Sequence, residues 1–390
     1  MPWKETNPMI EKEQFIAEML KAEMPFNRLC AKYGITEKTG YKWKKRFLED
    51  GKYGLQEESR APDTHPNSLS EDVVIRLIKL KEAHPYWGGK KIQILYARAY
   101  PDEDVPSLSS VNRVLDKAGL IKKHHIKPAS TDCKRLHQHI QPVEVNDVWA
   151  IDFKGWWKSS GEICEPFTVR DLVSRKILCV RLMQSKDSES VRFVMSNLFK
   201  EYGLPKVIRS DNGVPFTSSY GILSLTKLSV WWISLGIIPD RTEKGTPGQN
   251  GSIERMHADI SREIQGRVPG GVAANQAVID AWVEEYNSIR PNEALGMRVP
   301  DDVYVKSPRK YSGDFDEIEY PLGFLSRKVD RSGNIKLDSI KVPISTTCAG
   351  YNLGLRPTCE CHGYDVFLAD FLLGTIDTET YCFFPLDVLK

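Results

Sequence analysis

Three carboxylates occupy positions where an acid is unusual. Asp152 lies inside the apolar run Trp149-Ala150-Ile151-Asp152-Phe153, Asp211 precedes Asn212-Gly213, and Glu254 follows a Gly/Pro-rich loop. A carboxylate resists burial unless a partner or a metal ion neutralises its charge. The three acids are separated by 58 and 42 residues. Their settings indicate a divalent-metal site.

The residue types suit magnesium. Mg²⁺ prefers oxygen ligands, usually a few carboxylates with water and substrate phosphate oxygens. Two such ions about 4 Å apart can activate an attacking oxygen and stabilise the leaving oxygen in a displacement at phosphorus. We therefore expect Asp152 and Asp211 to hold two Mg²⁺ or Mn²⁺ ions, with Glu254 completing one coordination shell. On the residues alone, three acids with no common role remain an open alternative.

The segment that begins at Glu254 carries two more candidates. Arg255 is the next residue, and His257 lies one helical turn after Glu254. Both are candidate DNA contacts, although a local hydrogen bond would also explain His257. The glycine-containing loop 245–251 would let this helix shift when DNA arrives. Glu254 is therefore the acid that we expect to be out of place in an unliganded structure.

The region that must position the acids, residues 144–305, alternates between strands and helices. We predict strands at 148–154, 166–171, 176–183, 206–210 and 237–239, and helices at 188–202, 224–235, 252–266 and 274–287. The leading strands form hairpins and the later ones alternate with helices. This order predicts a mixed sheet covered by helices, an α/β domain.

Residues 1–60 are predicted to form an all-α domain with a helix-turn-helix. A short helix from Phe26 to Tyr33, a turn at Gly34 and a helix capped by Thr36 fit this pattern. The last helix could enter a major groove. Its candidate phosphate contacts are Lys38, Lys42, Lys44, Lys45 and Arg46. A small bundle with a solvated basic face is the alternative.

Residues 61–122 are predicted to form a second helix-turn-helix domain. Its candidate phosphate contacts are Lys90, Lys91 and Arg113. A helical bundle that only spaces domains explains the pattern equally well. Residues 123–143 continue as a basic linker, which with Lys122 and Lys123 could lie along DNA. Zinc binding by His124, His125 and Cys133 is disfavoured, because these residues lack paired-ligand spacing.

Residues 306–390 are predicted to contain a linker and then a small β-barrel, because short strands alternate with turns. The pair Cys359 and Cys361 invites a metal interpretation, but their one-residue gap favours packing and turn chemistry.

Composition limits the classes of protein to which the chain can belong. The chain has 390 residues, of which 41% are hydrophobic and 27% charged, with a net charge of +2. These values are ordinary for a globular protein, and no apolar run is long enough to cross a bilayer. Eight cysteines lack a framework spacing. We expect reduced thiols, a cytoplasmic location and no membrane partner.

Several segments together resemble the DDE transposases of bacterial insertion sequences, in the retroviral integrase superfamily. They are WAIDFKGWW, SDNGVPFTS, PGQNGSIERMH and YNSIRPNEALG in the centre, and LCAKYGITEKTGYKWKKRF before them. The resemblance is strongest from about Glu144 to Tyr304. The gap between Asp211 and Glu254 is longer than in many relatives, and we expect the extra residues between Gly221 and Trp231.

The resemblance implies an RNase H-like integrase core in which Asp152, Asp211 and Glu254 are the catalytic residues. It implies metal-dependent cleavage at transposon ends, followed by attack of the freed 3′-hydroxyl on target DNA. Terminal inverted repeats and target DNA would be the partners, and a homo-oligomer would hold two ends together. A domesticated, catalytically silent DNA-binding regulator and an RNase H-like nuclease without joining are the alternatives.

Overall fold

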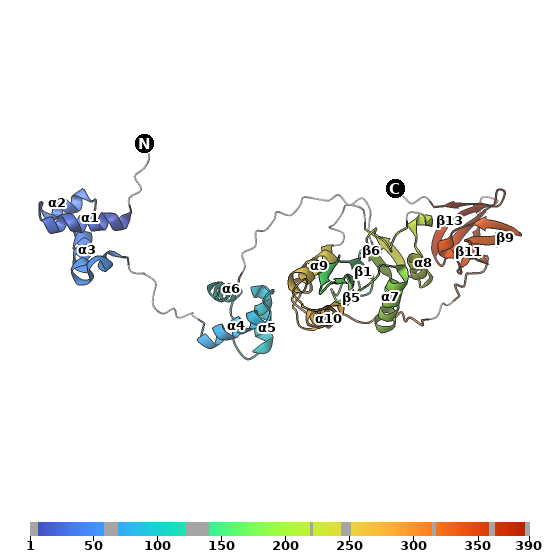
Figure 1. Ribbon diagram of the computed structural model, residues 1–390, viewed down its shortest axis with the longest axis horizontal. Coiled ribbons are helices and arrows are strands. Elements are labelled where there is room, and N and C mark those ends of the chain that lie inside the picture. Colours follow the sequence, from blue (N-terminus) through green and yellow to red (C-terminus); the bar gives the residue numbers. More distant parts are fainter. Residues whose placement is uncertain are drawn as a thin grey trace, which may run out of the picture. The chain divides into compact units, whose positions relative to one another are not determined.

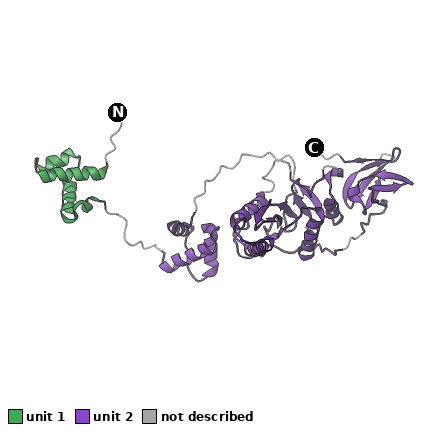
Figure 2. Cartoon of the chain, viewed as in Figure 1, with its two compact units in different colours: residues 1–70 green, residues 71–390 purple. Residues whose placement is uncertain are grey.

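The computed structural model describes residues 7–57, 69–121, 140–218, 221–242, 251–313, 317–358 and 363–386. Residues 1–70 and 71–390 form two compact units (Figure 2). Lys122, Lys123, His124, His125, Cys133, Cys359 and Cys361 lie outside the described residues, as does most of the loop before Glu254. Among the described residues, no helix is long and apolar enough to cross a membrane.

The first unit is helical, as predicted. Its elements are α1 (Pro8–Lys21), α2 (Phe26–Lys32), α3 (Glu37–Asp50) and the short helix η1 (Gly51–Leu55). The Thr36 side chain accepts a hydrogen bond from the Thr39 N–H at 3.3 Å and caps α3. Phe15, Leu29 and Trp43 are buried between the helices. The helix-turn-helix geometry therefore rests on a small apolar core.

The second unit begins with three helices, α4 (Glu71–Ala83), α5 (Gly89–Ala99) and α6 (Leu108–Lys117). Their apolar faces meet through the buried residues Leu77, Ile92 and Leu115. Polar contacts join these helices to the sheet domain: His84 Nδ1 lies 2.7 Å from Glu285 Oε1, and Arg98 Nη2 donates to the Met297 carbonyl at 3.0 Å. The helices are therefore attached to the rest of this unit by polar groups.

A five-stranded mixed sheet forms the centre of the second unit (Figure 1). Its strands are β1 (Val148–Phe153), β4 (Pro166–Asp171), β5 (Ile177–Leu182), β6 (Val207–Ser210) and β7 (Ile238–Arg241), in the order β5-β4-β1-β6-β7. β1 is antiparallel to β4 and parallel to β6, and β7 is parallel to β6. The predicted mixed α/β sheet is confirmed.

Helices cover both faces of this sheet. On one face, α7 (Ser188–Tyr202) and α8 (Lys227–Ser234) pack against residues such as Trp149 and Ile151. On the other, α9 (Gly251–Glu263) and α10 (Val272–Ser288) pack against Val148 and Ala150. Successive strand residues point to opposite faces. Asp152 therefore belongs to the face that α9 covers.

The sequence did not predict several smaller elements, and one helix begins later than predicted. A hairpin of β2 (Trp157–Ser159) and β3 (Glu162–Cys164) lies between β1 and β4 in the chain. The predicted helix 224–235 begins later, because η2 (Ile222–Ser224) precedes the Thr226 cap of α8. Two further short helices, η4 (Glu293–Leu295) and η5 (Pro300–Asp302), follow α10.

The C-terminal region is a β-sheet, but no closed barrel is present among the described residues. β8 (Leu325–Lys328), β11 (Asn352–Pro357), β12 (Gly363–Leu368), β13 (Phe371–Asp377) and β14 (Cys382–Pro385) form an open sheet in the order β14-β13-β12-β11-β8. The hairpin β9 (Asn334–Leu337) and β10 (Ile340–Pro343), followed by η6 (Thr346–Cys348), is a separate two-stranded sheet. The edge strands β8 and β14 are not hydrogen-bonded to each other, so the sheet does not close.

The first part of the predicted linker after residue 305 is bound to the central domain. Arg309 Nη1 donates to the Pro205 carbonyl at 2.7 Å, and its Nη2 donates to the Leu235 carbonyl at 2.9 Å. The Ser307 N–H donates to the Tyr202 carbonyl at 2.8 Å. One arginine thus satisfies carbonyl groups left free where a helix ends, which fixes the strap 305–313 in place.

Candidate active site

Strand register brings Asp152 and Asp211 together. β1 and β6 are parallel, and Ala150 is the partner of Arg209. Two residues further along each strand are Asp152 and Asp211, which therefore lie side by side where the strands end. Adjacent strands are about 4.8 Å apart. The ends of parallel strands at one sheet edge are a common place for ligand sites.

The pKa of Asp152 reflects this neighbourhood. Burial, and then the negative charge of Asp211, raise the pKa of Asp152 to about 7, and Glu254 adds a smaller repulsion. The Asp211 Oδ1 atom is buried with no hydrogen-bond partner. A Cβ atom on Gly213 would lie 2.8 Å from Asp211 Oδ2, so a larger residue there would force the carboxylate to shift.

Glu254 stands apart from this pair. It is exposed in the first turn of α9, whose buried residues Ile253, Met256 and Ile260 hold the helix against the sheet. The preceding residues 243–250 lie outside the described part. Among the described residues, no three His, Cys, Asp or Glu side chains are close enough together to hold a metal ion.

A divalent cation fits the Asp152 and Asp211 pair on two grounds. The buried, unpartnered oxygen of Asp211 is an available ligand. The mutual repulsion that raises the pKa of Asp152 is one that a cation would relieve. Glu254 would have to approach further to become a third ligand.

His257 makes a local hydrogen bond. Its Nε2 atom lies 2.9 Å from Thr168 Oγ1, and the Thr168 hydroxyl donates to the Asp152 carbonyl at 2.9 Å. Burial, and then the charge of Lys154, lower the pKa of His257 to about 4. A neutral His257 can donate from Nε2 to Thr168. This bond ties α9 to β4 and, through Thr168, to the backbone of β1.

The basic residues predicted as DNA contacts are distributed over both units. In the first unit, Lys38, Lys42 and Lys45 are exposed, whereas Lys44 and Arg46 are half-buried. Lys42 and Arg46 lie over the Trp43 ring at 4.9 and 5.5 Å.

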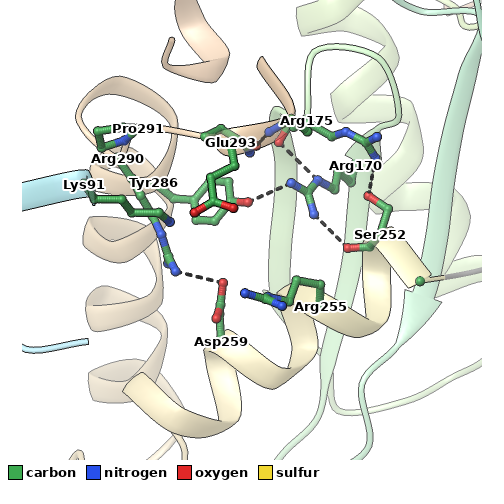
Figure 3. Close-up of a pocket in the computed structure, with 13 residues that line it drawn as sticks. Lys91, Arg170, Arg175, Ser252, Arg255, Asp259, Tyr286, Arg290, Pro291 and Glu293 are labelled. Atoms are coloured by element: carbon green, nitrogen blue, oxygen red, sulfur yellow. Dashed lines mark hydrogen bonds and ion pairs between the residues drawn. The ribbon is translucent and has the colours of Figure 1, made fainter. Parts of the chain in front are cut away.

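In the second unit, Lys90 and Arg113 are exposed. Arg255 is also exposed and lines a pocket together with Lys91 (Figure 3). The residues around that pocket that the sequence analysis missed are Arg170, Arg175 and Arg290. An arginine inside an otherwise apolar strand, as at position 170, was the available signal.

Models of two known domain families match parts of the chain. Two models described as an integrase core domain match residues 142–247 and 235–300. A homeodomain-like domain matches residues 39–115. The homeodomain-like match spans α3 to α6 and therefore includes parts of both units.

The chain is similar to proteins of two bacterial insertion elements. It is 25% identical over 254 residues to an uncharacterized 31.7 kDa protein of insertion element IS407 from Burkholderia multivorans, which covers 65% of this chain and 88% of the relative. It is 24% identical to an uncharacterized 39.2 kDa protein of insertion element IS476 from Xanthomonas euvesicatoria, which covers 63% of this chain and 68% of the relative.

Solved structures with similarity include an HTLV-2 integrase catalytic core domain in complex with magnesium. It has a TM-score of 0.33 and 15% identity, and covers 42% of this chain and 99% of that one. A simian T-cell lymphotropic virus intasome in complex with a PP2A regulatory subunit has a TM-score of 0.36 and 12% identity, and covers 76% of this chain and 97% of that one. Similarity at these scores supports no further conclusion.

Proposed function

We propose that this chain, which contains an integrase core and a homeodomain-like domain and is related to insertion-element proteins, is a DNA transposase. Its reaction would be cleavage at the element's ends and joining of those ends to target DNA. The observation that carries the proposal is the register of two parallel strands, which places Asp152 beside Asp211. The repulsion between them and the unpartnered Asp211 oxygen support a cation-binding role.

The proposed chemistry consists of two displacements at phosphorus. In the first, water attacks at the element's end and the bond to the 3′ oxygen breaks. In the second, the freed 3′-hydroxyl attacks a phosphorus of the target strand and forms a new phosphodiester bond, while the bond between that phosphorus and the 3′ oxygen of the target strand breaks. Bound Mg²⁺ or Mn²⁺ would supply charge neutralisation and activation of the attacking oxygen. Asp152 and Asp211 would hold the ions.

Glu254 would complete the site by movement of α9. The hydrogen bond between His257 and Thr168 holds the middle of this helix against β4, so the first turn is the part that can approach the acids. His257 then acts as a positioning residue for Glu254. The sequence around Glu254 allows this, because glycines at 245, 248 and 251 flank the turn.

DNA ends would be bound by the basic helix α3 and by the α4–α6 helices. Lys38, Lys42 and Lys45 are exposed on α3, and Lys90 and Arg113 are exposed in the second unit. Such residues supply affinity through phosphate contacts rather than base readout. Joining brings two element ends together, so we propose a homo-oligomer assembled on DNA.

The test is Mg²⁺-dependent joining of a labelled terminal repeat, taken from the DNA that flanks the coding region, to a plasmid. We expect Asp152→Asn, Asp211→Asn and Glu254→Gln each to abolish joining while end binding persists. Joining by any of the three variants would contradict the assignment of that residue. Hydrolysed ends without joined product would indicate a nuclease, and binding without either product would indicate a DNA-binding regulator.

A further inference from the structure

A basic pocket of about 400 Å³ lies beside α9 in the second unit (Figure 3). Its lining comes from α5, β4, α9 and α10 and from the turns that follow β4 and α10. Five basic side chains line it, with two acidic ones. The basic residues are Lys91, Arg170, Arg175, Arg255 and Arg290. Such an excess of positive charge in one cavity favours binding of an anionic ligand.

Arg170 is the buried centre of this charge. It is 3% exposed. Its guanidinium donates to the Arg175 carbonyl at 3.1 Å, the Ser252 carbonyl at 2.8 Å and the Tyr286 hydroxyl at 2.7 Å. All three acceptors are neutral, and within the described ranges no carboxylate forms an ion pair with Arg170. Neutral acceptors satisfy the donors but leave the positive charge without a counterion, which is costly for a buried group.

The neighbouring cations repel one another. Arg175 donates to the Ser252 hydroxyl at 2.9 Å, and burial followed by the charge of Arg170 lowers its pKa. Burial followed by the charge of Arg290 lowers the pKa of Lys91 to about 8. Each shift reflects a cation that is poorly compensated where it lies. An anion in the pocket would offset the repulsion and raise the pKa of both side chains.

The acidic residues do not balance this charge. Asp259 accepts a hydrogen bond from Arg290 at 2.9 Å and is also paired with Arg262 from outside the pocket. Arg290 is 6% exposed, and its Nε atom is buried without a partner. Glu293 is exposed at the rim. Arg290 Nη1 also lies 3.4 Å from Glu263 Oε1, which pairs with Arg262 as well. Asp259 and Glu263 therefore balance Arg290 and Arg262. The other four basic side chains of the pocket form no ion pair within the described ranges.

Arginine predominates in the pocket, and this favours an oxyanion such as phosphate over a halide. The planar guanidinium presents paired donors that match phosphate oxygens. The first turn of α9 also lines the cavity, where backbone N–H groups favour an anion. Arg255 is exposed at this turn and can meet a ligand that arrives from solvent.

The pocket adjoins the candidate active site through two elements. On β4, Arg170 lies two residues after Thr168 and therefore on the same face of the sheet, and Thr168 contacts His257 and the Asp152 carbonyl. On α9, Arg255 directly follows Glu254. A strand whose reacting phosphate lies at the acids would thus carry a neighbouring phosphate to the pocket.

We propose that this pocket binds a backbone phosphate of the DNA strand next to the phosphate that reacts. The identification of the polyanion as DNA rests on the proposed function, whereas the phosphate chemistry rests on the pocket itself. Inorganic phosphate is the other source of the same chemistry, and it is distinguished by experiment.

The test compares the full chain with the double variant Arg175→Gln/Arg255→Gln. Binding of a fluorescein-labelled 30-base-pair duplex is measured by anisotropy over a range of salt concentrations, with EDTA so that no reaction occurs. Loss of the single phosphate contact made by the pocket should reduce the slope of log affinity against log salt by about 1. Affinity should fall on the order of tenfold for each arginine.

The matched control is Arg181→Gln/Lys200→Gln, which removes two exposed positive charges outside the pocket. Its salt slope should equal that of the unmodified chain. Equal slopes for the pocket variant and this control would overturn the proposal. Circular dichroism melting identifies any variant that fails to fold. In that case Arg170→Lys provides the second test. It keeps the charge but not the paired donors, and we expect the same loss of affinity.

Calorimetric titration with inorganic phosphate forms the second arm. Weak or undetectable binding of phosphate, together with the lowered salt slope, supports a site for the DNA backbone. Tight phosphate binding with an unchanged slope overturns it in favour of a free-phosphate site. This assay involves no catalysis, so the two claims can fail separately. Absence of joining would contradict the proposed function but not phosphate binding in the pocket. An unchanged salt slope would contradict phosphate binding in the pocket but not the proposed function.

Discussion

Asp152 and Asp211 occupy matching positions on two adjacent parallel strands, each two residues beyond the paired residues Ala150 and Arg209. The two side chains come from segments far apart in the chain, and the sheet alone sets their separation. Without a cation their charges oppose each other, as the raised pKa of Asp152 records. The pair is therefore expected to respond to divalent metal even in the absence of DNA.

Removing one member of the pair should abolish this response. We expect the melting temperature of the unmodified chain to rise with MgCl₂, because a ligand that binds only the folded state stabilises it by about 2.7 kcal/mol at 100 times its Kd. Asp211→Asn should remove the rise. Asp280→Asn, an exposed acid on α10, is the control and should keep it. Equal Mg²⁺-dependent shifts in both variants would contradict metal binding at Asp211.

Thr168 links three elements through its hydroxyl, so its removal should be costly. Thr168→Val keeps the shape of the side chain but loses the contacts to His257 and to the Asp152 carbonyl. The free energy of unfolding in urea should fall by about 1–3 kcal/mol, because buried polar partners are left unsatisfied. Thr168→Ser retains the hydroxyl and should lose less. A valine variant as stable as the unmodified chain would show that this link is dispensable.

Lys91 should make stability depend on pH. Its folded pKa of about 8 is below the usual 10.5, so the unfolded chain binds more protons between these values and stability rises with pH across that window. Lys91→Met lacks the cost of burying the charge. The variant should be more stable at pH 7, by on the order of 1 kcal/mol, and this advantage should shrink toward pH 10.

The exposed neighbour Lys90 provides the control for this measurement. Thermal unfolding of Lys90→Met should differ from that of the unmodified chain by the same amount at pH 7 and pH 10. An advantage of Lys91→Met that stays constant over this range would mean that Lys91 is not the titrating group.

The C-terminal sheet should unfold together with the integrase core. Ile233 on α8 is 4% exposed and belongs to one apolar cluster with the C-terminal residues Leu353 and Val366. Ile233→Ala should cost about 2–5 kcal/mol and lower the transitions of both regions. Ile238→Ala, at a position 49% exposed, should have a small effect. Limited proteolysis that releases only the C-terminal sheet from Ile233→Ala would contradict a shared core.

The exposed lysines of α3 should contribute salt-dependent DNA affinity. Lys42→Ala/Lys45→Ala should lower the slope of log affinity against log salt by about 2, if each side chain meets one phosphate. Lys21→Ala/Lys52→Ala removes two exposed charges from α1 and η1 and serves as the control. An unchanged slope in the α3 variant would show that this face does not meet DNA.

Elements with a clear pattern could be predicted from the sequence. The strand at 166–171 was predicted with its observed bounds, because it is a continuous buried run. The three-residue strands β2 and β3 are too short to show a period and were missed. Residues 306–313 were predicted to be part of a linker, since their polar composition does not reveal that Arg309 donates to carbonyls about 70 to 100 residues away in sequence.

The carboxylates and the basic pocket also differ in how well the sequence predicts them. The acids could be picked out because each disturbs its local pattern, and the strands then account for the placement of Asp152 and Asp211. The basic pocket was missed because Arg170, Arg255 and Arg290 come from three separate segments. The unusual setting of Arg170 in an apolar strand does not reveal which residues lie beside it. The closure of a barrel depends likewise on contacts between strand edges, which local patterns do not determine.

Glu254 and Arg255 are consecutive residues on the first turn of α9. The two residues share one helical turn, so a shift of the backbone of this turn would move both side chains. A backbone seated against the arginine would advance the acid in the same motion. Binding of the DNA strand and completion of the active site would then occur together. A strand that has only partly entered would not be hydrolysed.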